Sequence, residues 1–268
     1  MKIKAMSYNI KNGFFDKDKD NKLRLNKTRQ KSAQKIIKKE NPEILIITEA
    51  DFAERKNNPQ DYKKIFKYPY GVFVDRPLMD RYFGIGILSK YPIIQSHKYA
   101  PKKSRWIEAL IKIKDTAIYV NAVHPSPLNT FTEKINLFKK VLKNKKHPYI
   151  LAGDFNSISP EDKYDKNKLL EAFIKKFNNR KKAEAVVNKI FKKETIKLLL
   201  KKGLVDTYKK KNKKWDYTYH TELSGNSYMR IDYIFCSDDI KVVDSGIIKN
   251  ILTEKASDHY PICAILEI

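Results

Sequence analysis

The sequence predicts a mixed α/β protein built as a single domain. Short apolar runs of strand length recur along the 268 residues, helical tracts lie between them, and no Gly/Ser-rich linker or internal repeat divides the chain. Hydrophobic residues make up 41% of the chain and aromatic residues 12%, which supports a packed core and excludes intrinsic disorder.

Eight runs are predicted to be strands because they are short, rich in β-branched residues and bordered by Gly, Pro, Asn or Asp. They cover residues 2–10, 43–50, 83–89, 106–114, 117–124, 149–155, 230–237 and 261–268.

Two tracts between these runs are predicted to be helices. In the first, Ala33, Ile36 and Ile37 fall at helical spacing, and Pro42 ends the helix. In the second, residues 131–144, the predicted apolar face carries Ile135, Phe138 and Leu142.

A longer helical tract over about 166–204 is predicted as a basic insertion in the domain, with Gly203 as its C-cap. Between Lys166 and Lys214 there are 18 Lys or Arg residues and 4 Asp or Glu residues, a net charge of +14. A solvated helical face is the favoured interpretation, and a wall of a nucleic-acid groove is the alternative.

The net charge of +25 permits binding to nucleic acid without proving it. Only eight of the 56 basic residues are Arg, the side chain best suited to bidentate phosphate recognition.

Cys236 and Cys263 stand alone in apolar runs and are expected to be reduced core residues. No signal peptide or membrane span is evident, so a cytoplasmic monomer is expected.

Polar side chains close the predicted strands or interrupt them. They are Asn9, Glu49, His124, Asp154, Asn156 and Asp232, with Asp258 and His259 immediately before the last strand. One polar strand end needs no explanation, but a whole set restricted to Asp, Glu, Asn and His indicates a common site at one rim. Carboxylates brought so close repel each other unless a cation or proton relieves them. Oxygen ligands favour Mg²⁺, whereas the spacing of His and Cys does not suit Zn²⁺.

Seven motifs in order, "SYNI", "ITEAD", "FGIGILSKYPI", "NAVHPSP", "GDFNSISPED", "RIDYIF" and "SDHYPI", resemble the endonuclease/exonuclease/phosphatase superfamily, which includes DNase I, AP endonucleases and inositol polyphosphate phosphatases. The resemblance spans nearly the whole chain. It implies a four-layered α/β/β/α sandwich of two mostly antiparallel sheets flanked by helices. It also implies cleavage of a phosphate ester that depends on Mg²⁺, with Mn²⁺ as a substitute.

The resemblance assigns expected roles to the rim residues. Glu49 would bind the metal with Asn9 beside it, and Asp258 would bind the same ion or a second one. Asp154 and Asn156, as alternate residues on one strand face, would point into one site, Asp154 toward the attacking water and Asn156 toward the phosphate. Asp232 would orient His259.

His124 separates subfamilies within the resemblance. AP endonucleases carry Tyr at this position and a Gln-Glu-x-Lys motif around the metal-binding Glu, whereas this chain has His124 and "TEAD". This disfavours an abasic-site endonuclease. His124 is expected to contact the phosphate or to protonate the leaving oxygen.

Each further substrate-binding candidate also has an alternative structural role. Arg105 would contact a phosphate and Asp80 would orient the rim histidine, or either would form a surface ion pair. Trp215, Tyr217 or Tyr219 would stack on a base or a sugar, or would pack under the sheet edge.

Three functional hypotheses follow from the sequence. The first is a metal-dependent phosphodiesterase that acts on DNA or RNA. The second keeps the chemistry but takes a small phosphorylated metabolite or a lipid headgroup as substrate. The third is a non-catalytic module that binds polyanions, which the complete set of rim residues disfavours.

Overall fold

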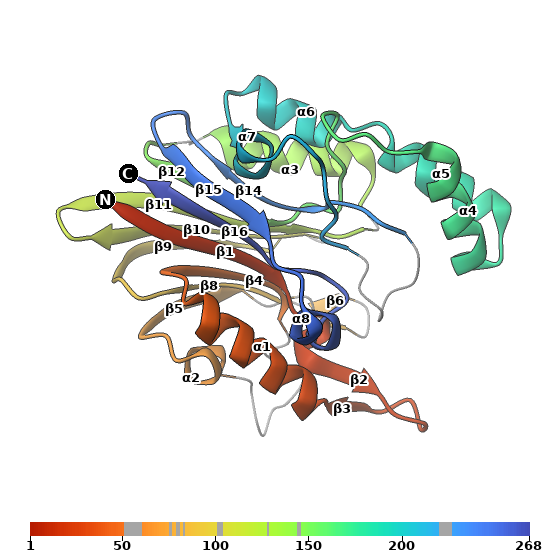
Figure 1. Cartoon of the computed structure of the whole chain (residues 1–268), viewed down its shortest axis with the longest axis horizontal. Helices are drawn as coiled ribbons and strands as arrows, with labels where there is room; N and C mark the ends of the chain where they lie inside the picture. The colour runs from red at the N-terminus through yellow and green to blue at the C-terminus, as the bar shows by residue number, and fades with distance from the viewer. Residues whose placement is uncertain are drawn as a thin grey trace.

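The computed structural model describes the chain except residues 51–60, 75–76, 79–80, 83, 101–103, 128, 144–145 and 220–226. Two six-stranded sheets lie face to face (Figure 1). The first sheet contains, in spatial order, β15 (Lys241–Ile247), β16 (Ile262–Glu267), β1 (Lys2–Asn9), β4 (Ile44–Ala50), β8 (Gly84–Ser89) and β5 (Tyr70–Val74). The second contains β13 (Val205–Asp206), β14 (Asp232–Cys236), β12 (Tyr149–Asp154), β11 (Thr116–Pro125), β10 (Ser104–Ile113) and β9 (Ile93–Tyr99).

Each sheet contains one parallel pair in an otherwise antiparallel arrangement. The parallel pairs are β1 with β4 and β11 with β12. Helix α1 (Lys27–Glu40) precedes β4, and α3 (Phe131–Lys143) connects β11 to β12. The remaining described strands form two small hairpins, β2 (Phe15–Lys17) with β3 (Leu23–Leu25) and β6 (Pro77–Leu78) with β7 (Arg81–Tyr82).

Helices cover the outer face of both sheets, which completes the predicted α/β/β/α order of layers. The first sheet is covered by α1, α2 (Tyr62–Phe66) and α8 (Ile251–Ala256), and the second by α3 and α6 (Glu194–Lys201). The other described helical segments are η1 (Asn12–Phe14), α4 (Lys166–Phe177), α5 (Arg180–Ile190) and α7 (Thr207–Lys211). None of the described helices is long and apolar enough to cross a membrane.

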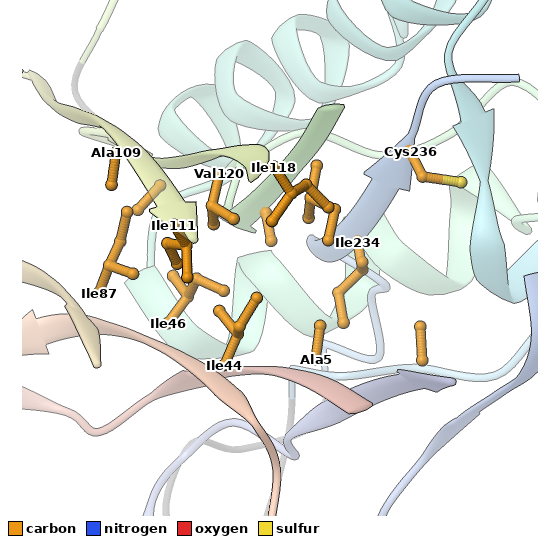
Figure 2. Packing of buried hydrophobic residues seen from close by; sticks show 14 of the residues in the cluster. Ala5, Ile44, Ile46, Ile87, Ala109, Ile111, Ile118, Val120, Ile234 and Cys236 are labelled. Atoms are coloured by element: carbon orange, nitrogen blue, oxygen red, sulfur yellow. The ribbon is translucent and has the colours of Figure 1, made fainter. Parts of the chain in front are cut away.

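The main core lies between the two sheets and follows from alternation along the strands. Ala5, Ile44 and Ile46 point inward from the first sheet, toward Ile118 and Val120 of the second (Figure 2). The alternate residues of β1 and β4 pack beneath α1, α2 and α8 instead. Because both faces of β4, β8 and β12 are buried, the sequences of these strands are almost continuously apolar.

The tract predicted as one long helix is divided into α4, α5 and α6. Asn178 adopts a left-handed conformation after α4, and the side chain of Asn179 caps α5 by accepting a hydrogen bond from the Lys182 amide. Gly203 has a φ of 79°, and the amide of the following residue, Leu204, bonds back to Leu199 after α6. The C-cap itself is Lys202, and Gly203 ends the helix as the next, left-handed residue, one position after the predicted one.

A buried ion triad anchors the segment that leads into β14. Arg230 is 0% exposed, and its Nε and Nη1 donate to Asp162 at 2.8 Å and to Asp206 at 2.7 Å. We expect Arg230→Leu to lower the free energy of unfolding by about 3–5 kcal/mol, because Asp206 then stays buried without its partner and Asp162 keeps only Lys209, 3.7 Å away. Urea unfolding measures the loss.

The matched control is Arg24→Leu, which removes the same side chain from an exposed pair with Asp18. That change should leave the free energy of unfolding close to that of wild type, since solvent screens the pair. Equal losses in the two variants would contradict a special role for the Arg230 triad.

Candidate active site

The parallel strand pairs bring four predicted site residues to one rim. Asn9 is the last residue of β1, Glu49 lies near the end of β4, His124 lies near the end of β11, and Asp154 is the last residue of β12. Strands that run parallel end at the same edge of their sheet. The two sheets face each other, so both sets of strand ends meet.

Antiparallel strands supply two more residues from the opposite direction. Asp232, the first residue of β14, lies opposite Asp154 in the strand register. His259 lies just before β16, the antiparallel neighbour of β1. The His259 Nδ1–H donates to Asp232 Oδ2 at 2.7 Å, the contact that the sequence predicted. This bond fixes the ring and turns Nε2 toward Asp154 at 4.0 Å.

Asp154 stands at the centre of this cluster and is 1% exposed. Its Oδ2 accepts from the Asn9 amide at 3.0 Å and lies 3.7 Å from Nε2 of His124. Its Oδ1 accepts from the backbone N–H of Asn156 at 2.8 Å. The carboxylate is therefore held in one orientation from both sides.

Burial and charge set the protonation of these groups. Burial raises the pKa of Asp154 to about 7, and Asp232 and Glu49 add to the rise. Burial opposes a charge on His259, but the carboxylates of Asp232, Asp154 and Asp258 outweigh it and raise its pKa well above the ordinary value. Burial lowers the pKa of His124 to about 3, so one imidazole is cationic and the other neutral near pH 7.

Glu49 has an unusual backbone conformation for a strand residue. Its φ is 53°, the register of β4 against β8 shifts between Thr48 and Ala50, and its Oε2 accepts from the Asn12 amide at 3.2 Å. A non-glycine residue in this conformation carries strain that surrounding structure must hold, a feature concentrated at functional sites.

The donor set fits a divalent cation. Glu49, His124 and Asp154 each offer a ligand atom, and these atoms lie within 4.8 Å of one another. Asp258 lines the same pocket, and burial together with Asp258 raises the pKa of Glu49. Carboxylates that destabilise one another's charge are relieved by a cation, and oxygen-rich sets of this kind suit Mg²⁺.

Asn156 reaches the pocket by a different route from the one predicted. Strand β12 ends at Asp154, so the two residues do not share a strand face as the alternation suggested. Asn156 has a φ of 46°, and its side-chain amide donates to the Pro125 carbonyl at 3.0 Å. It still lines the pocket because the left-handed turn carries it there.

Arg105 is 1% exposed, so the alternative of a surface ion pair is wrong. It lies directly opposite His124 in the antiparallel pair of β10 and β11. Its charge contributes to the lowered pKa of His124. Arg105 therefore lies beside His124 on the same face of the second sheet, and it is absent from the pocket lining.

Lys134 is a pocket residue that the sequence did not reveal. Of the predicted face, Phe138 is buried and Leu142 packs against the core, whereas Ile135 is only half-buried. The buried face of α3 also includes Lys134, Leu137 and Val141. The Lys134 Nζ donates to the Asn156 carbonyl and lies 3.5 Å from Ser157 Oγ. Burial lowers its pKa to about 7. The buried residues of α3 follow the i, i+3, i+4, i+7 spacing of an amphipathic helix, starting from Lys134. This spacing would have revealed Lys134 if the prediction had accepted a lysine on the buried face.

Two predicted stacking residues lie outside the pocket lining. The ring of Trp215 packs on Tyr164 with centroids 4.8 Å apart, and the ring of Tyr217 packs between Tyr228 and Tyr260. Both rings therefore pack against other aromatic residues and do not face the pocket. Tyr219, the third candidate, does line the pocket, and its ring lies 4.9 Å from that of His259. Asp80 lies outside the described residues.

The rim opens into a pocket of 460 Å³. Glu49, Asp154, Asn156, Asp258 and His259 form one end. The other end is bounded by α4, α5 and the turn after α5, so the basic tract is not only the solvated face that the sequence favoured.

A family model described as the Endonuclease/Exonuclease/phosphatase family matches residues 6–259. A protein described by that same name from Beutenbergia cavernae DSM 12333 is 17% identical, with a TM-score of 0.69, covering 100% of this chain and 72% of that one. A family protein from Leptotrichia buccalis C-1013-b is 17% identical, with a TM-score of 0.66 and coverage of 99% and 100%.

TDP2 from D. rerio, solved with a single-strand DNA product, is 17% identical, with a TM-score of 0.62 and coverage of 100% of this chain and 99% of that one. No curated protein matches the chain significantly. These likenesses to solved structures establish the fold.

The fold and the rim together define the class of phosphate-ester hydrolases. With a family model matched from residue 6 to residue 259, the chain belongs to the endonuclease/exonuclease/phosphatase family.

Proposed function

We propose that the protein is a Mg²⁺-dependent phosphodiesterase that cleaves DNA or RNA. The observation that carries the proposal is the cluster around Asp154 beside a lysine-lined pocket. Asn9 donates to this buried carboxylate, His124 and His259 lie 3.7 and 4.0 Å from it, and Asp232 orients His259. The single-strand DNA product bound to the TDP2 relative supports nucleic acid as the substrate.

Each residue has a role that its geometry supports. Asp154, with a pKa of about 7, accepts a proton from the attacking water, while Asn9 and the Asn156 amide keep its oxygens in place. His259, cationic and fixed by Asp232, donates from Nε2 to a phosphate oxygen. Glu49, with Asn9 or Asp258, would hold the Mg²⁺, which when bound offsets negative charge on the phosphoryl group.

Metal removal tests the proposal. We expect EDTA to abolish cleavage of an oligonucleotide, and Mg²⁺ or Mn²⁺ to restore it. Glu49→Gln should raise the Mg²⁺ concentration for half-maximal activity by about tenfold or more, because it removes a charged ligand. Glu171→Gln, on the exposed side of α4, is the control and should behave as wild type. Cleavage that persists in EDTA would reject metal dependence.

A substrate panel separates nucleic acid from the alternative of a small phosphorylated metabolite or lipid headgroup. The panel contains single- and double-stranded DNA, RNA, an abasic duplex and phosphomonoesters, with Asp154→Ala as the blank. Faster hydrolysis of a soluble monoester than of any oligonucleotide would overturn the assignment to nucleic acid.

A further inference from the structure

A helical arm forms the far wall of the active-site pocket. We define it as residues 166–193, which contain α4, α5 and the turn after α5. The arm packs on the rest of the molecule through Leu169, Phe173 and Val187, which share an apolar cluster with Ile158 and Ile231. In Figure 1 the two helices extend beyond the layers of the sandwich.

The pocket side of the arm alternates lysines with aromatic rings. Lys176 Nζ lies 5.2 Å from the centroid of the Tyr219 ring and donates to its hydroxyl at 2.7 Å. Lys182 Nζ lies 4.7 Å from the ring centroid of Phe177, on the neighbouring helix. Rings and lysines therefore line one continuous surface that leads to His259 and Asp154.

Four lysines of this surface have no carboxylate partner among the described residues. Lys176, Lys182, Lys192 and Lys193 line the pocket, and none is within ion-pair distance of an acidic group in the described part of the chain. Glu184, on the same arm, pairs with Arg180 instead of with these lysines. The positive field of the arm is thus directed into the pocket.

We propose that the helical arm is a subsite for single-stranded nucleic acid next to the scissile phosphate, with bases against Phe177 and Tyr219 and flanking phosphates at Lys176 and Lys182. The inference rests on the proposed function. The rim residues are sufficient to bind the one phosphate that is cleaved. A further row of lysines therefore fits a polymer with additional phosphates. Rings placed between those lysines fit its planar bases.

The shape of the site favours a single strand over a duplex. Paired and stacked bases present no free ring face, whereas an unpaired strand can place a base on an aromatic side chain. A hollow of 460 Å³ bounded by Phe177 and Tyr219 can accept a base but not a duplex. A phospholipid would bring one phosphate and a long chain, which leaves most of the lysines without a partner.

Binding in EDTA tests the subsite without any catalysis. The probe is a fluorescein-labelled oligothymidylate of about ten nucleotides, within the range that single-strand binding sites cover. We expect Lys176→Gln with Lys182→Gln to raise the Kd about tenfold or more. The slope of log K against log salt should fall by about 0.7 for each phosphate contact removed. Phe177→Ala should weaken binding roughly tenfold through lost stacking.

The matched control is Lys175→Gln with Lys181→Gln. It removes the same charge from the adjacent, exposed positions of the same two helices, which do not line the pocket. Its Kd should stay within about twofold of wild type, since exposed charges away from the ligand are screened. Equal weakening in both pairs would overturn the subsite in favour of a diffuse charge effect.

Other outcomes separate the subsite from the proposed function. If wild type hydrolyses bis(p-nitrophenyl) phosphate with Mg²⁺ and Asp154→Asn does not, the proposed chemistry stands. Unchanged oligothymidylate binding by the Lys176/Lys182 variant would then overturn the subsite alone. Tighter binding to a duplex, or to vesicles of phosphatidylglycerol and phosphatidylcholine, would also overturn it. Arm-dependent binding without any hydrolysis would support the subsite and reject the function.

Discussion

Asp154→Asn is expected to lower kcat/KM for an oligonucleotide by about 10²- to 10⁴-fold, the contribution of a positioned general base. The amide keeps the size of the carboxylate but cannot take a proton from water. Steady-state cleavage of a labelled oligonucleotide measures the loss. Asp115→Asn, in the exposed turn between β10 and β11, is the control and should leave kcat/KM unchanged.

The thermal stability of Asp154→Asn shows whether lost activity comes from the missing base or from a disrupted fold. Burial raises the pKa of Asp154 to about 7, so its charge is unfavourable in the folded protein. A neutral amide removes that charge, but it also leaves one of the two N–H donors, Asn9 Nδ2 or the Asn156 backbone, without an acceptor. The two effects oppose each other, so the Tm in EDTA should stay close to that of wild type. An inactive variant with an unchanged Tm would support the catalytic role. Retention of more than about a tenth of wild-type kcat/KM would contradict it, because positioning alone does not replace a base.

The sequence predicted the rim because topology makes strand ends converge. Asn9, Glu49, His124 and Asp154 end or nearly end strands whose apolar runs are buried on both faces, so their boundaries are sharp in the sequence. Two parallel pairs then bring these ends together. The bond between His259 and Asp232 followed from the same logic, since each starts or precedes an antiparallel strand.

The sequence was less informative where side chains on one face are exposed. Strands β5, β9 and β15 were not predicted, and β9 (Ile93–Tyr99) is an edge strand whose residues are almost all exposed. Lys134 was missed because a charged residue on an amphipathic helix is normally assigned to solvent. The predicted route of Asn156 into the site was wrong because the strand ends before this residue. Its positive φ belongs to the turn that follows, which strand alternation does not describe.

The loop aromatics show a different limit. Trp215, Tyr217 and Tyr219 lie within five residues of one another, yet only Tyr219 lines the pocket. Its backbone pairs with Met229 and His259, which fixes the ring beside the site. Long-range pairing of this kind leaves no local pattern in the sequence.

Gly153→Ala is expected to destabilise the protein by more than about 4 kcal/mol, because two severe effects coincide at one position. Gly153 has a φ of 143°, a conformation that residues with a side chain rarely adopt. A Cβ at this position would also lie 2.0 Å from the Val123 carbonyl oxygen of the neighbouring strand β11. Urea unfolding measures the loss of stability. Failure to obtain folded protein would also agree with the prediction.

Gly246→Ala is the matched control, because Gly246 also lies in a strand but a Cβ there would meet nothing within 4 Å. Its unfolding free energy should stay within about 0.5 kcal/mol of wild type. A Gly153→Ala variant that unfolds within about 1 kcal/mol of wild type would show that β11 and β12 can separate at little cost. In that case, the contacts of Asp154 with Asn9 and His124 would not depend on a glycine at position 153.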